Sequence, residues 1–215
     1  MKPLIVLAHG AGAGQSHPFM QAWAAHLRTF AHVVPFEYVY MQRPGRRPPD
    51  RLPKLLVRHR EVVDEAVAAH PGAPLVLVGK SMGSRVGCHL ANALGGTVRG
   101  LVCLGYPLKG RTSLRDEVLR ELTAPILFVQ GTRDPLCPLD LLAEVRPTMQ
   151  APSELHVVDG GDHSLMLRKR DLKAAGTTQD AVDAVTMQAV RDWVTALIGP
   201  DTRSRMRPPG DPEAG

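Results

Sequence analysis

Residues 75–85 constrain the fold of this chain more than any other segment. A short apolar run typical of a buried strand ends at Gly79, and a helical pattern begins at about Met82. Ser81 lies between them, with one glycine two residues before it and another, Gly83, two residues after it. In such a Gly-x-Ser-x-Gly pattern the strand and the helix pass so close that side chains at both glycine positions would collide. The segment therefore predicts a strand, a strained turn that presents a serine, and a helix.

Apolar runs of strand length alternate with segments of helical spacing along the rest of the chain. Each run is bounded by glycine or proline, as expected for short buried strands. The six predicted strands are residues 4–8, 33–40, 75–78, 100–105, 125–130 and 155–158. The predicted helices are residues 23–30, 55–67, 82–94, 114–122, 139–145 and 179–197, the last with an apolar face of Val182, Val185, Ala189, Trp193 and Ile198. This alternation predicts a doubly wound, mostly parallel α/β sheet, and Pro35 places the second strand at a sheet edge.

Composition and hydropathy favour one globular domain without a membrane anchor. The chain has 215 residues, of which 44% are hydrophobic, and this is enough for a sizeable core. No apolar stretch approaches the roughly 18 residues of a membrane-spanning helix, and the first residues predict a strand rather than a signal peptide. We expect a single domain over residues 1–198 and a disordered tail over the polar, proline-rich residues 199–215.

The three cysteines have no spacing typical of a zinc site or of a disulfide framework. Cys88 lies on the helix predicted after Ser81 and Cys103 lies in a predicted strand, so both are expected to be small core residues. For Cys137 a packing or surface role is favoured over a reactive thiol near the site. This usage suits a reducing cytoplasm, which is the expected location.

The net charge of +5 is concentrated in clusters, of which the largest lies among prolines and has no interleaved aromatic residues. Its members are Arg43, Arg46, Arg47, Arg51, Lys54, Arg58 and Arg60. A solvated loop is the favoured interpretation of this cluster. A rim that attracts an anionic substrate is the alternative, and nucleic-acid binding is disfavoured.

Functional groups of an open α/β sheet gather beyond the carboxyl ends of its strands. Three such positions hold a serine, an aspartate and a histidine, namely Ser81, Asp134 and His163, in the chain order expected of α/β-hydrolases. Ser81 would attack an acyl carbonyl, His163 would take its proton and return it to the leaving group, and Asp134 would orient the imidazole. Asp159 and Asp162 are rival acids, disfavoured because they lie too close to His163 in sequence to approach its ring from the neighbouring strand.

A tetrahedral intermediate on Ser81 needs two hydrogen-bond donors for its oxyanion. The backbone N–H groups of Met82 and Ala11 are the candidates, since one follows the nucleophile and the other lies in the glycine-rich loop after the first strand. His9 is expected to brace that loop. Residues 107–124 leave room for only one short helix, which excludes a large cap and predicts a shallow, open site. Candidate substrate-lining residues are Gly10, Gly12, Tyr106, Leu108 and Leu136.

Two glycine patterns that resemble nucleotide-binding motifs have the wrong spacing. Residues 10–14 read Gly-Ala-Gly-Ala-Gly, so the third glycine comes one position early for a dinucleotide fingerprint. The Gly-Lys-Ser sequence at residues 79–81 lacks the earlier glycine of a phosphate-binding loop, because that position is Pro74. No cluster of His, Asp and Glu has metal-ligand spacing. We therefore expect no cofactor and no metal.

The motif segments together resemble a family of small α/β-hydrolases. They are residues 9–12, 79–85, 105–108, 131–134 and 162–164. The family includes dienelactone-hydrolase-like predicted bacterial hydrolases and the testis-expressed protein 30 group, and the resemblance covers almost all of residues 2–198. It implies an α/β-hydrolase fold with Ser81, Asp134 and His163 as a catalytic triad. Dienelactone hydrolases themselves have cysteine where this chain has Ser81, so their substrate is not carried over.

The favoured function is a serine hydrolase that cleaves an ester or thioester of a small or accessible acyl substrate through an acyl-enzyme. Two alternatives remain open. One is a non-catalytic binding or scaffold protein with the same fold, and the other is an acyltransferase that excludes water from the same intermediate. The expected partner is a small-molecule acyl substrate that carries an anionic group if the arginine cluster forms a rim, with no nucleic acid and no membrane.

Overall fold

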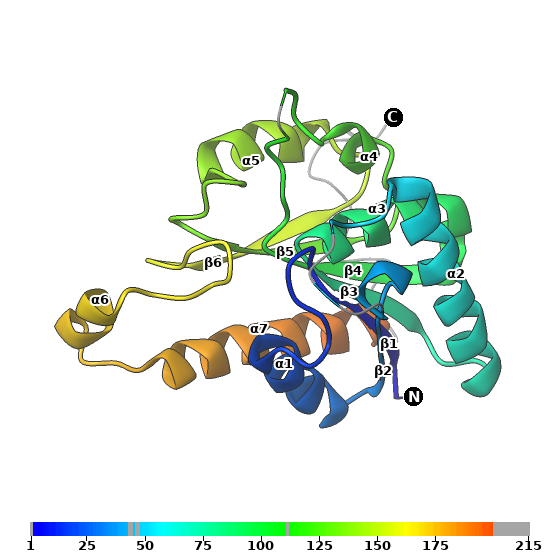
Figure 1. Ribbon diagram of the computed structural model, residues 1–215, viewed down its shortest axis with the longest axis horizontal. Coiled ribbons are helices and arrows are strands. Elements are labelled where there is room, and N and C mark those ends of the chain that lie inside the picture. The colour runs from blue at the N-terminus through cyan, green and yellow to red at the C-terminus, as the bar shows by residue number, and fades with distance from the viewer. Residues whose placement is uncertain (1, 43–44, 46–47, 111, 200–215) are drawn as a thin grey trace, which may run out of the picture.

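Six strands form one sheet in the computed structural model, which describes residues 2–42, 45, 48–110 and 112–199 (Figure 1). The strands are β1 (Leu4–Ala8), β2 (His32–Phe36), β3 (Leu75–Lys80), β4 (Val98–Leu104), β5 (Ile126–Gly131) and β6 (Ser153–Val158). Their order in the sheet is β2-β1-β3-β4-β5-β6, and every neighbouring pair is parallel. The α/β class with six parallel strands is therefore confirmed.

Helices cover both faces of the sheet, because alternate residues of each strand point to opposite faces and nearly all are apolar. In β1, Leu4 and Val6 belong to one hydrophobic cluster, whereas Ile5 and Leu7 belong to the other. The first cluster is completed by α2 (Leu52–Ala69), α3 (Met82–Leu94), α4 (Glu117–Arg120) and α5 (Leu139–Val145). The second is completed by α1 (Pro18–Arg28) and α7 (Gln179–Ile198), which lie together below the sheet in Figure 1. The remaining helical segments are α6 (Lys169–Ala174) and the 3₁₀ turns at Val39–Gln42, Gly95–Thr97 and Arg146–Thr148.

The second strand is an edge strand, as its proline predicts. Pro35 pairs with Leu7 of β1, and among the described residues β2 has no other neighbour in the sheet. The strand is shorter than predicted, however, since it ends at Phe36 rather than continuing to Tyr40. The chain turns inward there because both Tyr38 and Tyr40 are buried against the loop after β1.

Two helix predictions were wrong in detail. Only Glu117–Arg120 of the predicted helix 114–122 is helical, because Arg115 is tied to the preceding loop through its N–H to Leu108 and its carbonyl to the Tyr106 hydroxyl. On α7, Val185 is 65% exposed, although the sequence pattern placed it on the buried face. The buried residues of this helix are Thr186, Val190, Trp193, Val194 and Leu197. The α6 helix was not predicted.

A glycine of β4 explains how α7 is oriented. A Cβ atom at Gly100 would collide with the side chain of Leu197 and would lie 3.0 Å from that of Trp193. The absence of a side chain at Gly100 therefore lets these two residues pack directly on the sheet, and their contact fixes which stripe of the helix is buried.

The order of the strands creates a crevice at their carboxyl ends. The chain leaves β1 toward β2 at one edge, whereas it leaves β3 toward β4 in the opposite direction, so β1 and β3 form a topological switch point where ligands of such sheets bind. Among the described residues between β4 and β5, the only helix is the four-residue α4, so the expected absence of a large cap at this place is confirmed.

Part of the sequence-based interpretation lies outside the described residues. This applies to Arg43, Arg46 and Arg47 of the arginine cluster and to residues 200–215 of the expected tail. Among the helices that the structure describes, none combines the length and the apolar character needed to cross a membrane.

Candidate active site

The turn at Ser81 has the strained backbone that its sequence predicts. Ser81 has φ 50° and ψ −113°, a conformation that a residue with a side chain rarely adopts. A Cβ atom at Gly79 would collide with the backbone of Ser84, and one at Gly83 would lie 2.6 Å from the carbonyl oxygen of His9. Only glycine fits at these two positions, as predicted, because α3 passes directly against the ends of β3 and β1.

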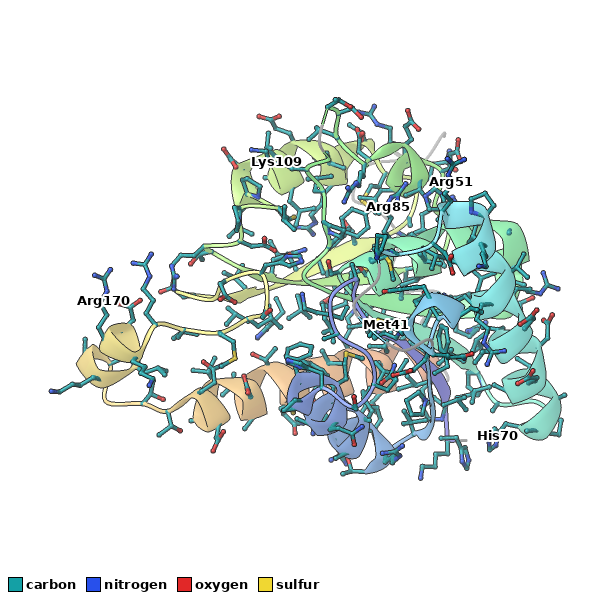
Figure 2. The ribbon with its side chains drawn as sticks, viewed as in Figure 1. Met41, Arg51, His70, Arg85, Lys109 and Arg170 are labelled. Atoms are coloured by element: carbon teal, nitrogen blue, oxygen red, sulfur yellow. The ribbon has the colours of Figure 1, made fainter. Side chains whose placement is uncertain are left out.

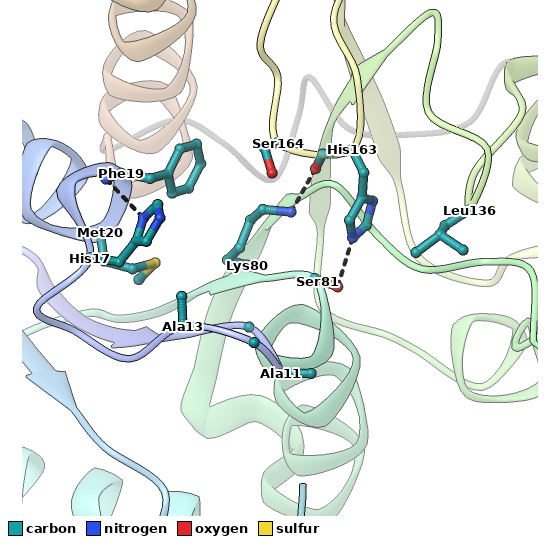
Figure 3. A pocket seen from close by; sticks show the side chains of 12 residues that line it. Ala11, Ala13, His17, Phe19, Met20, Lys80, Ser81, Leu136, His163 and Ser164 are labelled. Atoms are coloured by element: carbon teal, nitrogen blue, oxygen red, sulfur yellow. Dashed lines mark hydrogen bonds between the residues drawn. The ribbon is translucent and has the colours of Figure 1, made fainter. Parts of the chain in front are cut away.

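Ser81, His163 and Asp134 form a continuous chain of hydrogen bonds. The Ser81 Oγ atom is 2.8 Å from His163 Nε2 (Figure 3). On the other side of the ring, His163 Nδ1 is 2.8 Å from Asp134 Oδ2. The side chain of Asp134 is fully buried, whereas that of His163 is 24% exposed. A carboxylate can only accept, so Nδ1 carries the imidazole proton and Nε2 is left to accept the hydroxyl proton of Ser81. Three loops, from the ends of β3, β5 and β6, bring these groups together.

Buried donors hold the Asp134 carboxylate in place. The Leu136 N–H donates to Oδ1 over 2.8 Å. The amide of Gln130, with its nitrogen toward Asp134, donates to Oδ2 over 3.3 Å and accepts the N–H of Tyr106 over 2.7 Å. Gln130 is fully buried, and sequence reasoning missed it. The available signal was a polar residue near the end of an otherwise apolar strand, four residues before Asp134.

The two rival acids are engaged elsewhere. Asp162 accepts the backbone N–H groups of Ser164 and Met166 at 2.8 and 3.1 Å and so shapes the loop that carries His163. Asp159 accepts from the hydroxyl of Thr132. Neither carboxylate is within hydrogen-bond distance of the His163 ring, to which Asp134 is bound.

Lys80 is a second buried polar residue that sequence reasoning missed. Its ammonium donates to the carbonyl oxygen of His163 over 2.6 Å, and it lies 5.9 Å from the centre of the Phe19 ring (Figure 3). Burial lowers the pKa of Lys80 to about 8, although Asp134 and Asp162 act in the opposite direction. A charged residue between Gly79 and the candidate nucleophile was the signal in the sequence.

The side chains of His9 and Tyr40 hold the backbone of the loop after β1. His9 Nδ1 is 2.6 Å from the Gly10 carbonyl oxygen, and the Tyr40 hydroxyl donates to the same oxygen and to that of Ala11 at 3.3 and 3.0 Å. In a trans peptide the carbonyl and the next N–H point in opposite directions, so the Ala11 N–H points away from these buried groups. Met82 is the first residue of α3, and its N–H has no acceptor within the helix.

Comparison with known proteins identifies the family of this chain. Residues 1–195 match the model of the alpha/beta hydrolase domain family. The chain belongs to this family.

Several solved structures of other proteins share the fold of this chain. Est1E from Butyrivibrio proteoclasticus, solved with ferulic acid bound, is 16% identical with a TM-score of 0.69, over 91% of this chain and 89% of that chain. A dienelactone hydrolase from Anabaena variabilis is 18% identical with a TM-score of 0.67, over 87% of this chain and 83% of that one. XC6422 from Xanthomonas campestris, described as an α/β serine hydrolase without lid, is 19% identical with a TM-score of 0.63, over 90% and 83% of the two chains.

Two cavities flank Ser81 in this alpha/beta hydrolase domain. One, of about 330 Å³, has Phe19, Met20, Lys80 and His163 in its wall, and we call it the Phe19 cavity. The other, of about 310 Å³, has Leu52, Met82, Arg85 and Arg115 in its wall, and we call it the Arg85 cavity. Ala11, Ser81 and Leu136 line both.

The predicted substrate-lining residues separate into two groups. Gly10, Gly12 and Leu136 lie in the wall of the Phe19 cavity. Tyr106 and Leu108 are fully buried and line neither cavity, so their predicted place at the substrate was wrong. The chain turns after β4, and this turn directs both side chains into the core, where the Tyr106 ring packs edge-on against Phe128.

The three cysteines lie in the core. Cys88, Cys103 and Cys137 are free and fully buried, which confirms the predicted packing of the first two. Burial, reinforced by the nearby Asp134, raises the pKa of the Cys137 thiol to about 12, so this group stays protonated. Within the described part of the chain, no three His, Cys, Asp or Glu side chains come together in a way that could hold a metal ion.

Proposed function

We propose that this alpha/beta hydrolase domain is a serine hydrolase that cleaves an ester or thioester bond through an acyl-enzyme intermediate. The observation that carries the proposal is the hydrogen-bonded chain from Ser81 through His163 to the buried Asp134, with both contacts at 2.8 Å. A nucleophile, a base and a group that orients the base are thus within the distances that acyl transfer requires.

The proposed first step is attack of the Ser81 Oγ on the acyl carbonyl. His163 Nε2 takes the hydroxyl proton, and the nearby carboxylate of Asp134 stabilises the positive imidazolium. The N–H groups of Ala11 and Met82 would donate to the developing oxyanion. The bond from the acyl carbon to the leaving oxygen or sulfur then breaks, and His163 returns the proton to that atom.

In the second step a water molecule takes the place of the leaving group. His163 removes a proton from the water as it attacks the acyl-enzyme, and the same proton returns to Ser81 when the product acid is released. The exposed edge of the His163 ring supports this step, since solvent can reach it. The distance of 2.8 Å between Ser81 Oγ and His163 Nε2 argues against the scaffold alternative, because a protein without turnover has no need of this contact.

The test is an activity-based label combined with substitution of the nucleophile. We expect a fluorophosphonate probe to label the wild type on Ser81, and we expect Ser81→Ala to lose the label and several orders of magnitude in hydrolysis of p-nitrophenyl butyrate. Ser84→Ala is the matched control, because Ser84 is buried and its hydroxyl is bonded to the Ser81 carbonyl. Equal turnover by wild type and Ser81→Ala, or no labelling of the folded wild type, would disprove the proposal.

A further inference from the structure

The Arg85 cavity contains positive charge that no side chain among the described residues neutralises. Arg85 Nε is buried and has no hydrogen-bond partner, and among the described residues its guanidinium makes no ion pair. The Arg115 guanidinium donates from Nη1 to the Pro107 carbonyl at 3.3 Å and, within the part of the chain that the structure describes, makes no ion pair. A buried donor without an acceptor costs free energy, and an anionic ligand bound beside the candidate nucleophile would supply the acceptor.

The only carboxylate in the wall of this cavity, among the described residues, is already paired. Asp50 is 3.0 Å from the ammonium of Lys54, and its side chain is 20% exposed. The carboxylate and this lysine largely cancel each other, so Arg85 and Arg115 leave the cavity with an excess of positive charge.

Arg85 lies close to Ser81 along the chain, in the first turn of α3. Ser81 directly precedes this helix, and the Arg85 N–H donates to the Ser81 carbonyl over 3.2 Å. Residues four apart lie on the same side of a helix, separated by about 6 Å along its axis. Figure 2 shows Arg85 on the side of the molecule that carries α2 and α4.

The position of His163 decides which part of the substrate enters which cavity. His163 lines the Phe19 cavity and not the Arg85 cavity. The general acid must reach the leaving atom, so the leaving group occupies the Phe19 cavity and the acyl chain extends into the Arg85 cavity. An anionic group there belongs to the acyl half of the substrate.

We propose that the substrate is a monoester or monothioester of a short dicarboxylic acid, roughly four to six carbon atoms long, whose free carboxylate is bound by Arg85 and Arg115. This inference rests on the proposed function. In the reaction Ser81 Oγ bonds to the acyl carbon as the bond to the leaving alcohol or thiol breaks, and the serine proton passes through His163 to the leaving atom. Water then releases the free dicarboxylic acid and restores Ser81, while the guanidinium groups remain unchanged.

The kinetic test compares three esters of equal acyl length on wild type and Arg85→Gln. Monomethyl glutarate carries the carboxylate on the acyl side, the pentanoate ester of glycolic acid carries it on the leaving-group side, and methyl pentanoate is neutral. We expect Arg85→Gln to lower kcat/KM for monomethyl glutarate about 10- to 100-fold, the value of a charge-assisted contact, and to change methyl pentanoate less than about threefold. Arg85→Lys should restore part of the loss, and the preference of the wild type should weaken at high salt.

Arg99→Gln is the matched control, because Arg99 is an exposed arginine at the start of β4, the end of the sheet away from the site. A preference for the glycolate ester that disappears in Arg85→Gln would overturn the assignment to the acyl side. Equal losses on all three esters, or no preference for either anion in the wild type, would overturn the inference while leaving the proposed function intact.

A binding measurement makes the inference testable without turnover. In the Ser81→Ala background, calorimetry with monomethyl glutarate should detect binding that Arg85→Gln abolishes and Arg99→Gln does not. Equal binding with and without Arg85, or no binding to a folded Ser81→Ala protein, would overturn the inference. If Ser81→Ala instead hydrolyses these esters as fast as the wild type, the proposed function fails, which is a distinguishable result.

Discussion

The loop after β1 and the loop after β6 reach Ser81 from different sides (Figure 3). Buried polar groups hold both loops in place, but the groups that hold one loop are neutral and those that hold the other are charged. On the β1 side, His9 and Tyr40 hold the backbone around Ala11. Burial lowers the pKa of His9, so its ring is neutral, with Nδ1–H donating to Gly10 and Nε2 accepting the N–H of Tyr38 over 3.2 Å.

On the β6 side, the holding groups are ionic. The Asp134 carboxylate accepts from the His163 ring, and the Lys80 ammonium donates to the His163 backbone carbonyl. The difference follows from the task of each loop. A backbone N–H that donates to an oxyanion needs only the correct orientation, which neutral groups can provide. An imidazole that becomes positive during the reaction needs a negative partner. We therefore expect the β6 side to be sensitive to alkali and the β1 side to be sensitive to acid.

The largest expected effect comes from neutralising the ionic side. Asp134→Asn should lower kcat about 10³- to 10⁴-fold, because an amide oriented by Leu136 would no longer hold the proton on His163 Nδ1 or stabilise the imidazolium. Hydrolysis of p-nitrophenyl butyrate measures the loss, and Asp159→Asn is the control. If Asp134→Asn turned over at the wild-type rate, the ionic half of the comparison would be wrong.

A smaller loss is expected from the neutral side. His9→Leu should lower kcat about 100-fold with little change in KM, since it frees the Gly10 carbonyl and lets the Ala11 N–H turn away from the oxyanion. The thermal midpoint of the variant shows whether it remains folded. A loss confined to KM would contradict the assignment of His9 to the oxyanion loop.

The ionic side should be sensitive to alkali through Lys80. As the pH rises through about 8, the ammonium becomes an amine and its bond to His163 weakens, so kcat of the wild type should fall roughly tenfold. The kcat of Lys80→Met should be lower than that of the wild type below pH 8 and should not decline as the pH rises.

Stability should change in the opposite direction over the same range. Between pH 8 and the ordinary lysine pKa of 10.5 the unfolded chain binds more protons at Lys80 than the folded chain. The free energy of unfolding of the wild type should therefore rise with pH relative to that of Lys80→Met, as urea titrations can measure. A parallel fall of activity and stability would show that Lys80 acts only as a structural group.

The neutral side should be sensitive to acid, with little effect on activity at neutral pH. Its Tyr38 hydroxyl lies 3.2 Å from Nδ1 of the fully buried His59, and burial lowers the pKa of His59 from 6.5 to about 3. Between these values the unfolded chain binds a proton that the folded chain does not, so stability is complete above pH 6.5 and declines as the pH falls toward 3. His59→Leu should reduce this decline by up to about 1.4 kcal/mol per pH unit. Identical acid-unfolding curves for the two proteins would refute this.

Local sequence patterns were sufficient for the fold class and for the candidate nucleophile. The alternation of short apolar runs with helical segments predicts a parallel sheet, because each strand of such a sheet is buried on both faces. Pro35 identified an edge strand, since proline cannot donate in the ladder. Gly79 and Gly83 identified the turn at Ser81, because their side-chain positions are already occupied by backbone.

Only the tertiary structure decided which polar side chains support these groups. Lys80, Gln130 and Tyr40 each contact a partner that is more than 20 residues away in sequence, namely His163, Tyr106 and Ala11, so their local sequence does not identify these partners. The side chains of Tyr106 and Leu108 follow a strand end as the site residues do, but the turn of the backbone sends them into the core. Likewise, only the folded structure reveals that Arg85 Nε has no acceptor among the described residues.

The sequence by itself determined which residues stand at the strand ends, because periodicity and steric exclusion act over a few residues. Tertiary packing determined which of them meet, how they are oriented and whether their charges are compensated, because burial, dielectric environment and hydrogen-bond partners depend on segments that come from the whole chain.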